Sequence, residues 1–189
     1  MKCLFTYSLY LFMILSLCTC KDKEDPVPTT LPEATQSGNN TLGFMLDGER
    51  WVARTTGTDL PIKCSYKQKK LEIEAMLVDS TRFDILTINA TNIDKEGLYI
   101  YGDSSQSEGG WTARFFTAPE VCFYTVSPIK VATLEITRLD TIQGIISGNF
   151  GFTQVSTTCH TDIETDPECV KLCRDAIITE GRFDALSFP

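Results

Sequence analysis

The sequence is poor in the residues and motifs that most enzyme mechanisms need. It contains one histidine, His160, which lies among threonines in a polar stretch. It has no G-x-S-x-G turn, no H-E-x-x-H helix, no P-loop and no glycine-rich dinucleotide fingerprint. A pair of carboxylates brought together by the fold would leave no motif, so a hydrolase remains the minor alternative. These absences favour a non-catalytic protein that needs no cofactor.

Positive charge is also scarce. The chain has 17 Lys and Arg against 25 Asp and Glu, which gives a formal net charge of −8. The short basic run of Lys67, Lys69 and Lys70 is typical of a solvated turn. Because an acidic surface repels phosphates, no nucleic-acid partner is expected.

One long apolar run is present, at the N-terminus. It extends from Leu4 to Leu17 behind Lys2, which is typical of a secretory signal, and it is shorter than the ~20 apolar residues of a spanning helix. The residues that follow, Leu17-Cys18-Thr19-Cys20, are similar to the lipobox of bacterial lipoproteins. They predict a signal peptide over residues 1–19 and acylation of Cys20, for example with palmitate. An ordinary secretory signal with an unmodified Cys20 is the alternative.

The stretch after Cys20 indicates a tether. Lys21 to Asp25 resembles the export signal that directs lipoproteins to the outer face of the outer membrane, although a plain solvated tether has the same composition. Residues 26–40 are rich in Pro, Thr, Ser, Gly and Asn, and they cannot bury enough apolar surface to fold alone. We therefore predict a lipidated Cys and flexible linker over residues 20–40. The predicted location is the cell outer membrane, lipid-anchored and surface-exposed.

Residues 41–189 have the pattern of one all-β domain. Asp47-Gly48 between two apolar segments is typical of a tight hairpin, and residues 71–77 alternate apolar and charged side chains as a half-buried strand does. Further strands are expected at 83–93, 97–102, 111–117, 122–126, 131–139, 143–155 and 177–184. About ten short strands predict an antiparallel β-sandwich or barrel-like sandwich. One short helix is expected near residues 167–174, with Asp166 as its N-cap and Pro167 in its first turn.

Eight cysteines are many for 189 residues. Outside the leader and the anchor they are Cys64, Cys122, Cys159, Cys169 and Cys173. In an exported protein such cysteines favour disulfides. The expected pairs are Cys64 with Cys122, and Cys159 with Cys169 or Cys173, which leaves one thiol unpaired. A zinc site formed by His160 with the last three cysteines is the alternative, but adjacent ligands seldom fit one tetrahedral ion, so no metal is predicted.

Two tryptophans, Trp51 and Trp111, could bind a ligand or fill the core. Trp111 follows Gly109-Gly110 at a loop mouth, where an exposed indole could stack on a sugar with Tyr99 and Tyr101 beside it. A buried core position is the commoner environment of a tryptophan among apolar neighbours, and it is the alternative for Trp111 and Trp51.

Four segments together resemble an uncharacterised family of Bacteroidetes surface lipoproteins. They are residues 31–43 (LPEATQSGNNTLG), 48–52 (GERWV), 146–152 (ISGNFGF) and 180–184 (EGRFD). The resemblance implies an envelope location and carries no activity. The stretch from Cys159 to Cys173 is an addition to the family pattern.

Three functions follow as hypotheses. A binding module for a glycan or for a host or envelope protein predicts an aromatic or polar patch. A structural or accessory lipoprotein of an envelope assembly predicts an exposed edge strand or an apolar patch. A hydrolase predicts a cleft with two close carboxylates or an activated His160.

Overall fold

The fold is all-β, as the sequence predicts. The computed structural model describes residues 29–56, 58–101, 110–119, 121–127, 129–157 and 172–187. Within these ranges eleven strands form one curled sheet, and all neighbouring strands pair antiparallel. The strands are β1 (Thr41–Leu46), β2 (Glu49–Val52), β3 (Ile62–Lys67), β4 (Lys70–Val78), β5 (Phe83–Ala90), β6 (Gly97–Tyr101), β7 (Trp111–Ala118), β8 (Cys122–Val126), β9 (Ala132–Asp140), β10 (Ile145–Ser156) and β11 (Ala176–Leu186).

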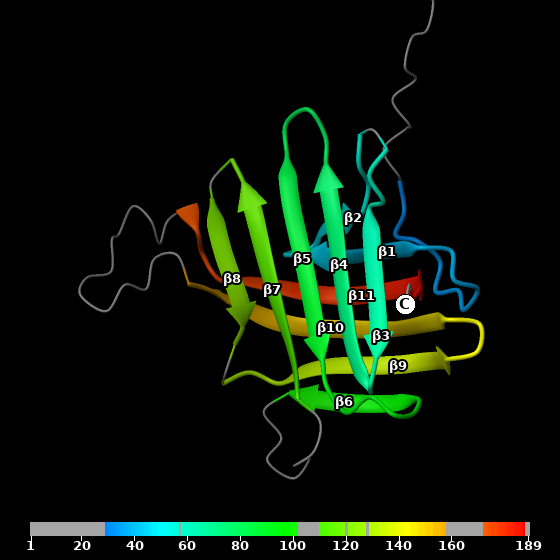
Figure 1. The fold of residues 1–189 in the computed structure, drawn as a ribbon. Helices are drawn as coiled ribbons and strands as arrows, with labels where there is room; N and C mark the ends of the chain where they lie inside the picture. The colour runs from blue at the N-terminus through cyan, green and yellow to red at the C-terminus, as the bar shows by residue number, and fades with distance from the viewer. Residues whose placement is uncertain are drawn as a thin grey trace, which may run out of the picture.

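The sheet folds over to make two layers. Its strand order is β2-β1-β11-β10-β8-β7-β5-β4-β3, with β9 on β10 and β6 on β9. Strand β10 joins the layers, because its first part pairs with β9 and its last three residues pair with β8. The strands β3, β4, β5, β7 and β8 therefore form one layer, which runs across the layer of β1, β2, β6, β9, β10 and β11 (Figure 1). Short bridges at Arg54–Leu77 and Cys64–Ser187 connect the layers again, which makes the sandwich barrel-like.

The alternating pattern of the sequence decides which face of each strand is inside. On β4, Leu71 and Ile73 are almost fully buried while Glu72 between them is exposed. On β5, Ile88 pairs directly with Ile73 and points to the same interior. Because side chains alternate with a period of two, a slip by one residue would turn this apolar set to solvent, so the pattern fixes the register.

Two hairpins have tight turns with positive φ angles. Asp47 and Gly48 have φ values of 50° and 83°, which confirms the predicted turn between β1 and β2. The turn between β3 and β4 has the same character, with φ of 52° at Gln68 and 64° at Lys69. Strand β3 was not predicted, because this turn contains neither Gly nor Asn. The lysines around it lie at an exposed turn, as expected from their composition.

Aromatic rings fill the space between the layers. Phe44 stacks on Trp51 with a centroid separation of 4.6 Å, and Phe115 and Phe150 contact Phe44 edge-on at 6.1 and 6.0 Å. Trp51 also donates its indole N–H to the buried carboxylate of Asp84 at 2.9 Å. These side chains come from both layers, so their packing holds the layers together.

Several sequence predictions fall outside the described residues. Residues 158–171 contain Cys159, His160, Cys169 and most of the predicted helix at 167–174, and residues 1–28 contain Cys20. Within the described ranges, no helix is long and apolar enough to cross a membrane.

Candidate functional site

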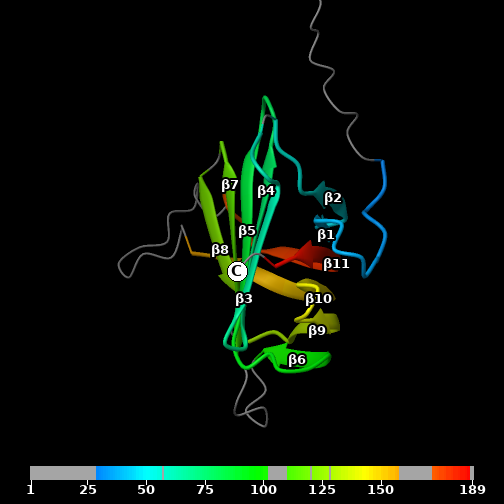
Figure 2. The same cartoon turned by 45° about the vertical axis from the view of Figure 1, so that its right-hand side comes forward.

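The segment of residues 31–40, called the strap here, lies along the sheet of β1, β11 and β10. Figure 2 shows it in blue beside β1 and β11, on the side of the molecule away from β7 and β8. Its Gly38 is buried against Leu186 and Ile145, and Gly43, just beyond the strap, packs beside Pro32. The sequence placed this segment in a flexible linker that ends at residue 40. That boundary is wrong, because the strap is held to the sheet by long-range contacts.

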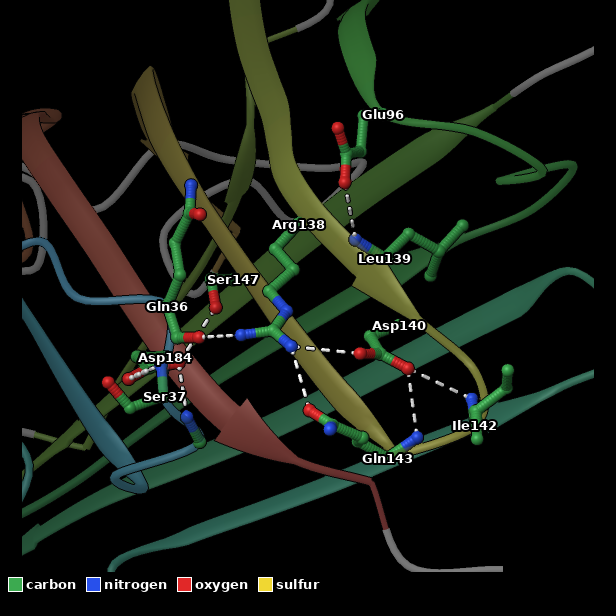
Figure 3. A network of polar contacts seen from close by, with 11 residues as sticks. Gln36, Ser37, Glu96, Arg138, Leu139, Asp140, Ile142, Gln143, Ser147 and Asp184 are labelled. Carbon is green, nitrogen blue, oxygen red and sulfur yellow. Dashed lines mark hydrogen bonds and ion pairs between the residues drawn. The ribbon is translucent and has the colours of Figure 1, made fainter.

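The carboxylate of Asp184 on β11 is the main attachment point of the strap (Figure 3). Its side chain is 1% exposed and accepts five hydrogen bonds. The donors are Thr35 Oγ1 at 2.6 Å, Ser37 N at 3.0 Å, Gly38 N at 2.8 Å, Asn39 N at 3.2 Å and Ser147 Oγ at 2.7 Å. Three successive backbone N–H groups of the strap thus converge on one buried negative charge.

This environment keeps Asp184 ionised. Burial alone would raise the pKa of its carboxyl group, but the hydrogen bonds from Thr35, Ser147, Gly38 and Asn39 outweigh burial and lower the pKa to about 2. The carboxylate is therefore charged in the folded protein at any pH above about 3, and the strap stays paired with it.

Arg138 on β9 makes a second attachment. Its guanidinium donates to the backbone carbonyl of Gln36, and also to Asp140 Oδ2 and Gln143 Oε1, both at 2.8 Å. Asp140 in turn accepts the backbone N–H groups of Ile142 and Gln143 at 3.1 and 2.9 Å, which shapes the turn between β9 and β10. Figure 3 shows this chain of contacts from the strap across to the turn. Two strands therefore hold the strap at neighbouring residues, β11 through Asp184 and β9 through Arg138.

These contacts give a physical reason for the motifs at the two ends of the domain. Thr35, Gly38 and Asn39 belong to the opening motif, Ser147 to the penultimate strand and Asp184 to the closing GRFD segment. In the fold these distant segments make one buried polar cluster. Gly148 beside Ser147 is needed for the same packing, since a Cβ there would lie 2.2 Å from the Glu135 carbonyl oxygen.

The outer surface of the other layer carries three phenylalanines in contact, called the phenylalanine face here. Phe83, Phe116 and Phe123 come from β5, β7 and β8, with ring centroids 6.1 Å apart for Phe83–Phe116 and 4.8 Å for Phe116–Phe123. Phe83 is 42% exposed and Phe123 is 50% exposed. Met76 and Ile85 continue the same cross-strand row. The layer that carries this face lies on the far side of the sandwich from the strap (Figure 2).

A groove lies next to the strap on the outer surface of β9, β10 and β11. It has a volume of about 520 Å³, and Glu135 and Glu180 are among its lining residues. Glu135 accepts a hydrogen bond from Asn149 Nδ2 at 2.9 Å, and Glu180 lies 3.7 Å from the Arg182 guanidinium. Glu135 is thus paired with an amide donor and Glu180 with a guanidinium.

The predicted aromatic binding residues do lie together, but Trp111 belongs to the core. Its side chain is 3% exposed and contacts Phe152 and Tyr101 with centroid separations of 5.8 and 6.2 Å. Its indole N–H donates to the Tyr99 carbonyl at 3.2 Å, and the Tyr99 hydroxyl donates to the Lys95 carbonyl at 2.8 Å. Trp111 is too buried to stack on a sugar, so the core alternative describes it.

The disulfide in the described residues joins Cys122 to Cys173, with a Cα–Cα distance of 5.5 Å. The expected bridge between Cys64 and Cys122 is wrong. These cysteines lie on β3 and β8, four strand spacings apart in the sheet order, which amounts to roughly 19 Å at 4.8 Å per strand. A disulfide needs Cα atoms within about 7 Å of each other. Cys173 is likewise not the partner of Cys159.

Cys64 is a free, buried thiol on β3. Burial raises its pKa to about 12, so the reactive thiolate is almost absent at neutral pH. We expect alkylation of Cys64 in the folded protein to be at least ~100-fold slower than in denaturant. Mass spectrometry of the Cys64 peptide after iodoacetamide treatment measures this separately from the other cysteines. Equal rates in buffer and in denaturant would contradict the buried position.

The described residues contain no group of three His, Cys, Asp or Glu side chains placed to hold a metal ion. Comparison with protein-family models, with curated proteins and with solved structures finds no match.

Proposed function

We propose that the protein is a lipid-anchored, non-catalytic interaction module of the bacterial cell surface, and that it binds a protein partner through the phenylalanine face. The observation that carries the proposal is the contact of three partly exposed phenylalanines on one outer sheet surface. Contiguous exposed apolar surface is unusual in a protein that acts alone, and it is typical of an interaction site.

The side on which the strap is held supports a display role. Lipidation at Cys20 would place the membrane at the N-terminal end of the strap. The eleven Cα–Cα steps from Cys20 to Leu31 can span at most about 40 Å. The strap enters the domain on the side away from β7 and β8 (Figure 2). A tether from that side leaves the phenylalanine face accessible to molecules beyond the membrane.

The composition of the face favours a protein over a glycan as its partner. Phe rings contribute large apolar area and no hydrogen-bonding group, which suits the dry centre of a protein interface. The next row on the same surface is polar and includes Thr87 and the exposed Arg114, as the rim of such an interface is. A permanent envelope partner would make the protein an accessory subunit of an assembly. The apolar row supports that second function equally.

A photo-crosslinking experiment in living cells tests the proposal. The full chain carries p-benzoylphenylalanine in place of Phe83, and the matched control carries it in place of the exposed Glu72 on the outer surface of β4. We expect a discrete protein adduct from position 83 and none from position 72. A Phe123→Ser change in the position-83 chain should reduce the adduct several-fold, because it removes part of the same apolar surface. Adducts of equal yield from both positions would contradict the proposal.

A further inference from the structure

At one position on the floor of the groove beside the strap, the surrounding atoms would allow a side chain, but the residue is a glycine. Gly151 points outward from β10 on the groove floor. A Cβ built there would meet only the Ile178 carbonyl oxygen at 3.5 Å and Thr133 Oγ1 at 3.9 Å, which are ordinary contacts. A glycine inside a strand costs roughly 0.5–1 kcal/mol relative to alanine. Gly151 lies opposite a bulge in β11, and no packing contact excludes a side chain there, so the glycine leaves open space on the groove floor.

The neighbouring glycines differ in this respect. At Gly181, on the same floor, a Cβ would lie 2.5 Å from the Phe150 ring, and at Gly148 it would lie 2.2 Å from a backbone oxygen. Those two positions are glycine because the chain is packed against them. A glycine inside a strand marks a bulge, a tight bend or a place where a ligand or another backbone approaches closely, and the open groove beside Gly151 suits the approach of a ligand.

An irregularity in β11 brings polar side chains to the same groove. The register of β11 shifts by a bulge against both β10 and β1. Thr179 and Glu180 lie opposite the single residue Gly151 of β10, and Glu180 and Gly181 lie opposite Phe44 of β1. Glu180 has a φ of 52°, a conformation that costs a non-glycine residue about 1 kcal/mol or more. Thr179 and Glu180 are both exposed and line the groove. Bulges of this kind re-aim side chains next to binding sites.

The groove offers hydrogen-bond acceptors and donors together with apolar surface. Glu135 and Glu180 are acceptors, while Arg182 and the Asn149 amide are donors. Ala34 of the strap and the half-exposed Leu98 of β6 form apolar walls. The volume of about 520 Å³ lies within the range of small-molecule sites.

We propose that this groove binds a neutral saccharide. A sugar hydroxyl both donates and accepts, so one ring can donate to Glu135 or Glu180 and accept from Arg182, while its C–H face lies on Leu98. An anionic ligand would meet two carboxylates, and a cationic ligand would meet the guanidinium. The site lies in the other layer from the phenylalanine face and is independent of the protein partner proposed above.

The test is a binding titration of the full chain, purified in detergent and followed by ligand-observed NMR. The probes are neutral oligosaccharides of two to four glucose, mannose, galactose or N-acetylglucosamine units, with oligogalacturonate and tri-lysine as the charged arms. We expect at least one neutral series to bind and both charged probes to fail. Gly151→Leu fills the groove and should abolish binding. Arg182→Gln should weaken binding about tenfold or more, because it removes a charged donor.

Two further variants make the result decisive. Thr153→Leu places the same side chain two residues along the outer surface of β10, away from the groove lining, and should bind as the unaltered chain does. Gly151→Ala makes only ordinary contacts, so it folds, and it should weaken binding by a measurable factor. Failure of every neutral probe, tighter binding of a charged probe, or unchanged binding by both Gly151 variants would overturn the proposal.

Discussion

Replacing Asp184 by asparagine is expected to lower the free energy of unfolding by about 3 kcal/mol and to release the strap from the sheet. The five donors around this carboxylate are Thr35, Ser37, Gly38, Asn39 and Ser147. An amide keeps the shape of the side chain but removes the charge and turns one acceptor into a donor. Several buried N–H and O–H groups then lose their partner or face another donor, and each such loss is costly.

Urea denaturation measures the stability loss, and hydrogen exchange at residues 37–39 measures the release of the strap. The matched control is Asp94→Asn, because Asp94 is half-exposed and has a single ion pair with Lys69 at 3.2 Å. That pair should contribute less than ~1 kcal/mol. If Asp184→Asn kept the stability and the amide protection of the unaltered protein, the strap would not depend on the carboxylate.

The same residue predicts how stability changes in acid. Its pKa is lowered from about 4 in the unfolded chain to about 2 in the folded protein. Its contribution is therefore fully present above pH ~4 and is lost as the pH falls toward 2, in the amount of roughly 2–3 kcal/mol. The unaltered protein should lose stability steeply across this window. The Asp184→Asn variant should lose less, with a remaining slope from Asp79, whose pKa is also about 2 because of hydrogen bonds from Thr81 and Arg54.

Removing the disulfide is expected to have the largest effect on stability. Cys122 and Cys173 are 51 residues apart in the sequence, and closing a loop of that size in the unfolded chain corresponds to about 4 kcal/mol in the chain-entropy model. Both sulfurs are buried, so the double variant Cys122→Ala/Cys173→Ala also loses packing. The combined loss should be about 4 kcal/mol or slightly more by urea denaturation.

A peptide map under non-reducing conditions identifies the bridge independently. We expect the Cys122 peptide joined to the Cys173 peptide. A Cys159→Ala/Cys169→Ala variant, which keeps the bridge, is the control and should retain most of the stability. A map in which Cys122 is joined to any other cysteine would refute the assignment.

The strands were predictable because their information is local. The alternation of apolar and charged residues indicates which face of a strand is buried, as at Leu71, Glu72 and Ile73. The Asp47-Gly48 pair indicates where the chain turns. Strand β3 was missed because the turn at Gln68-Lys69 adopts positive φ angles without a glycine. The sequence of β3 has a weak strand pattern of its own, and β3 is stabilised by its antiparallel pairing with β4.

The strap and the disulfide depend on residues far apart in the sequence. Thr35 and Asp184 are separated by 149 positions. The strap has the polar composition of a linker, and its own sequence does not show that a distant carboxylate binds it. Cysteine pairing has many combinations and is settled by the strand order, which no local pattern gives.

The two proposed binding surfaces were hidden for different reasons. Phe83, Phe116 and Phe123 were assigned to strands, but apolar residues on both faces of a strand do not indicate which of them remain exposed. Gly151 lies on the floor of the groove, but a glycine in a sequence does not show whether neighbouring side chains fill the space beside it. Trp111 and Tyr99 lie together as predicted, but Trp111 is buried in the core and donates its indole N–H to the Tyr99 carbonyl, while Tyr99 is partly buried against the core.

We propose that this domain is displayed on a membrane by a lipid at Cys20. The most direct measurement is metabolic labelling of the full chain with alkyne-palmitate in a Gram-negative host, followed by separation of membrane and soluble fractions. We predict that the unaltered chain and Cys18→Ala are labelled and remain in the membrane fraction. Cys20→Ala should be unlabelled, because its acylated residue is gone. Label that persists in Cys20→Ala, or is lost in Cys18→Ala instead, would show that Cys20 is not the lipidated residue.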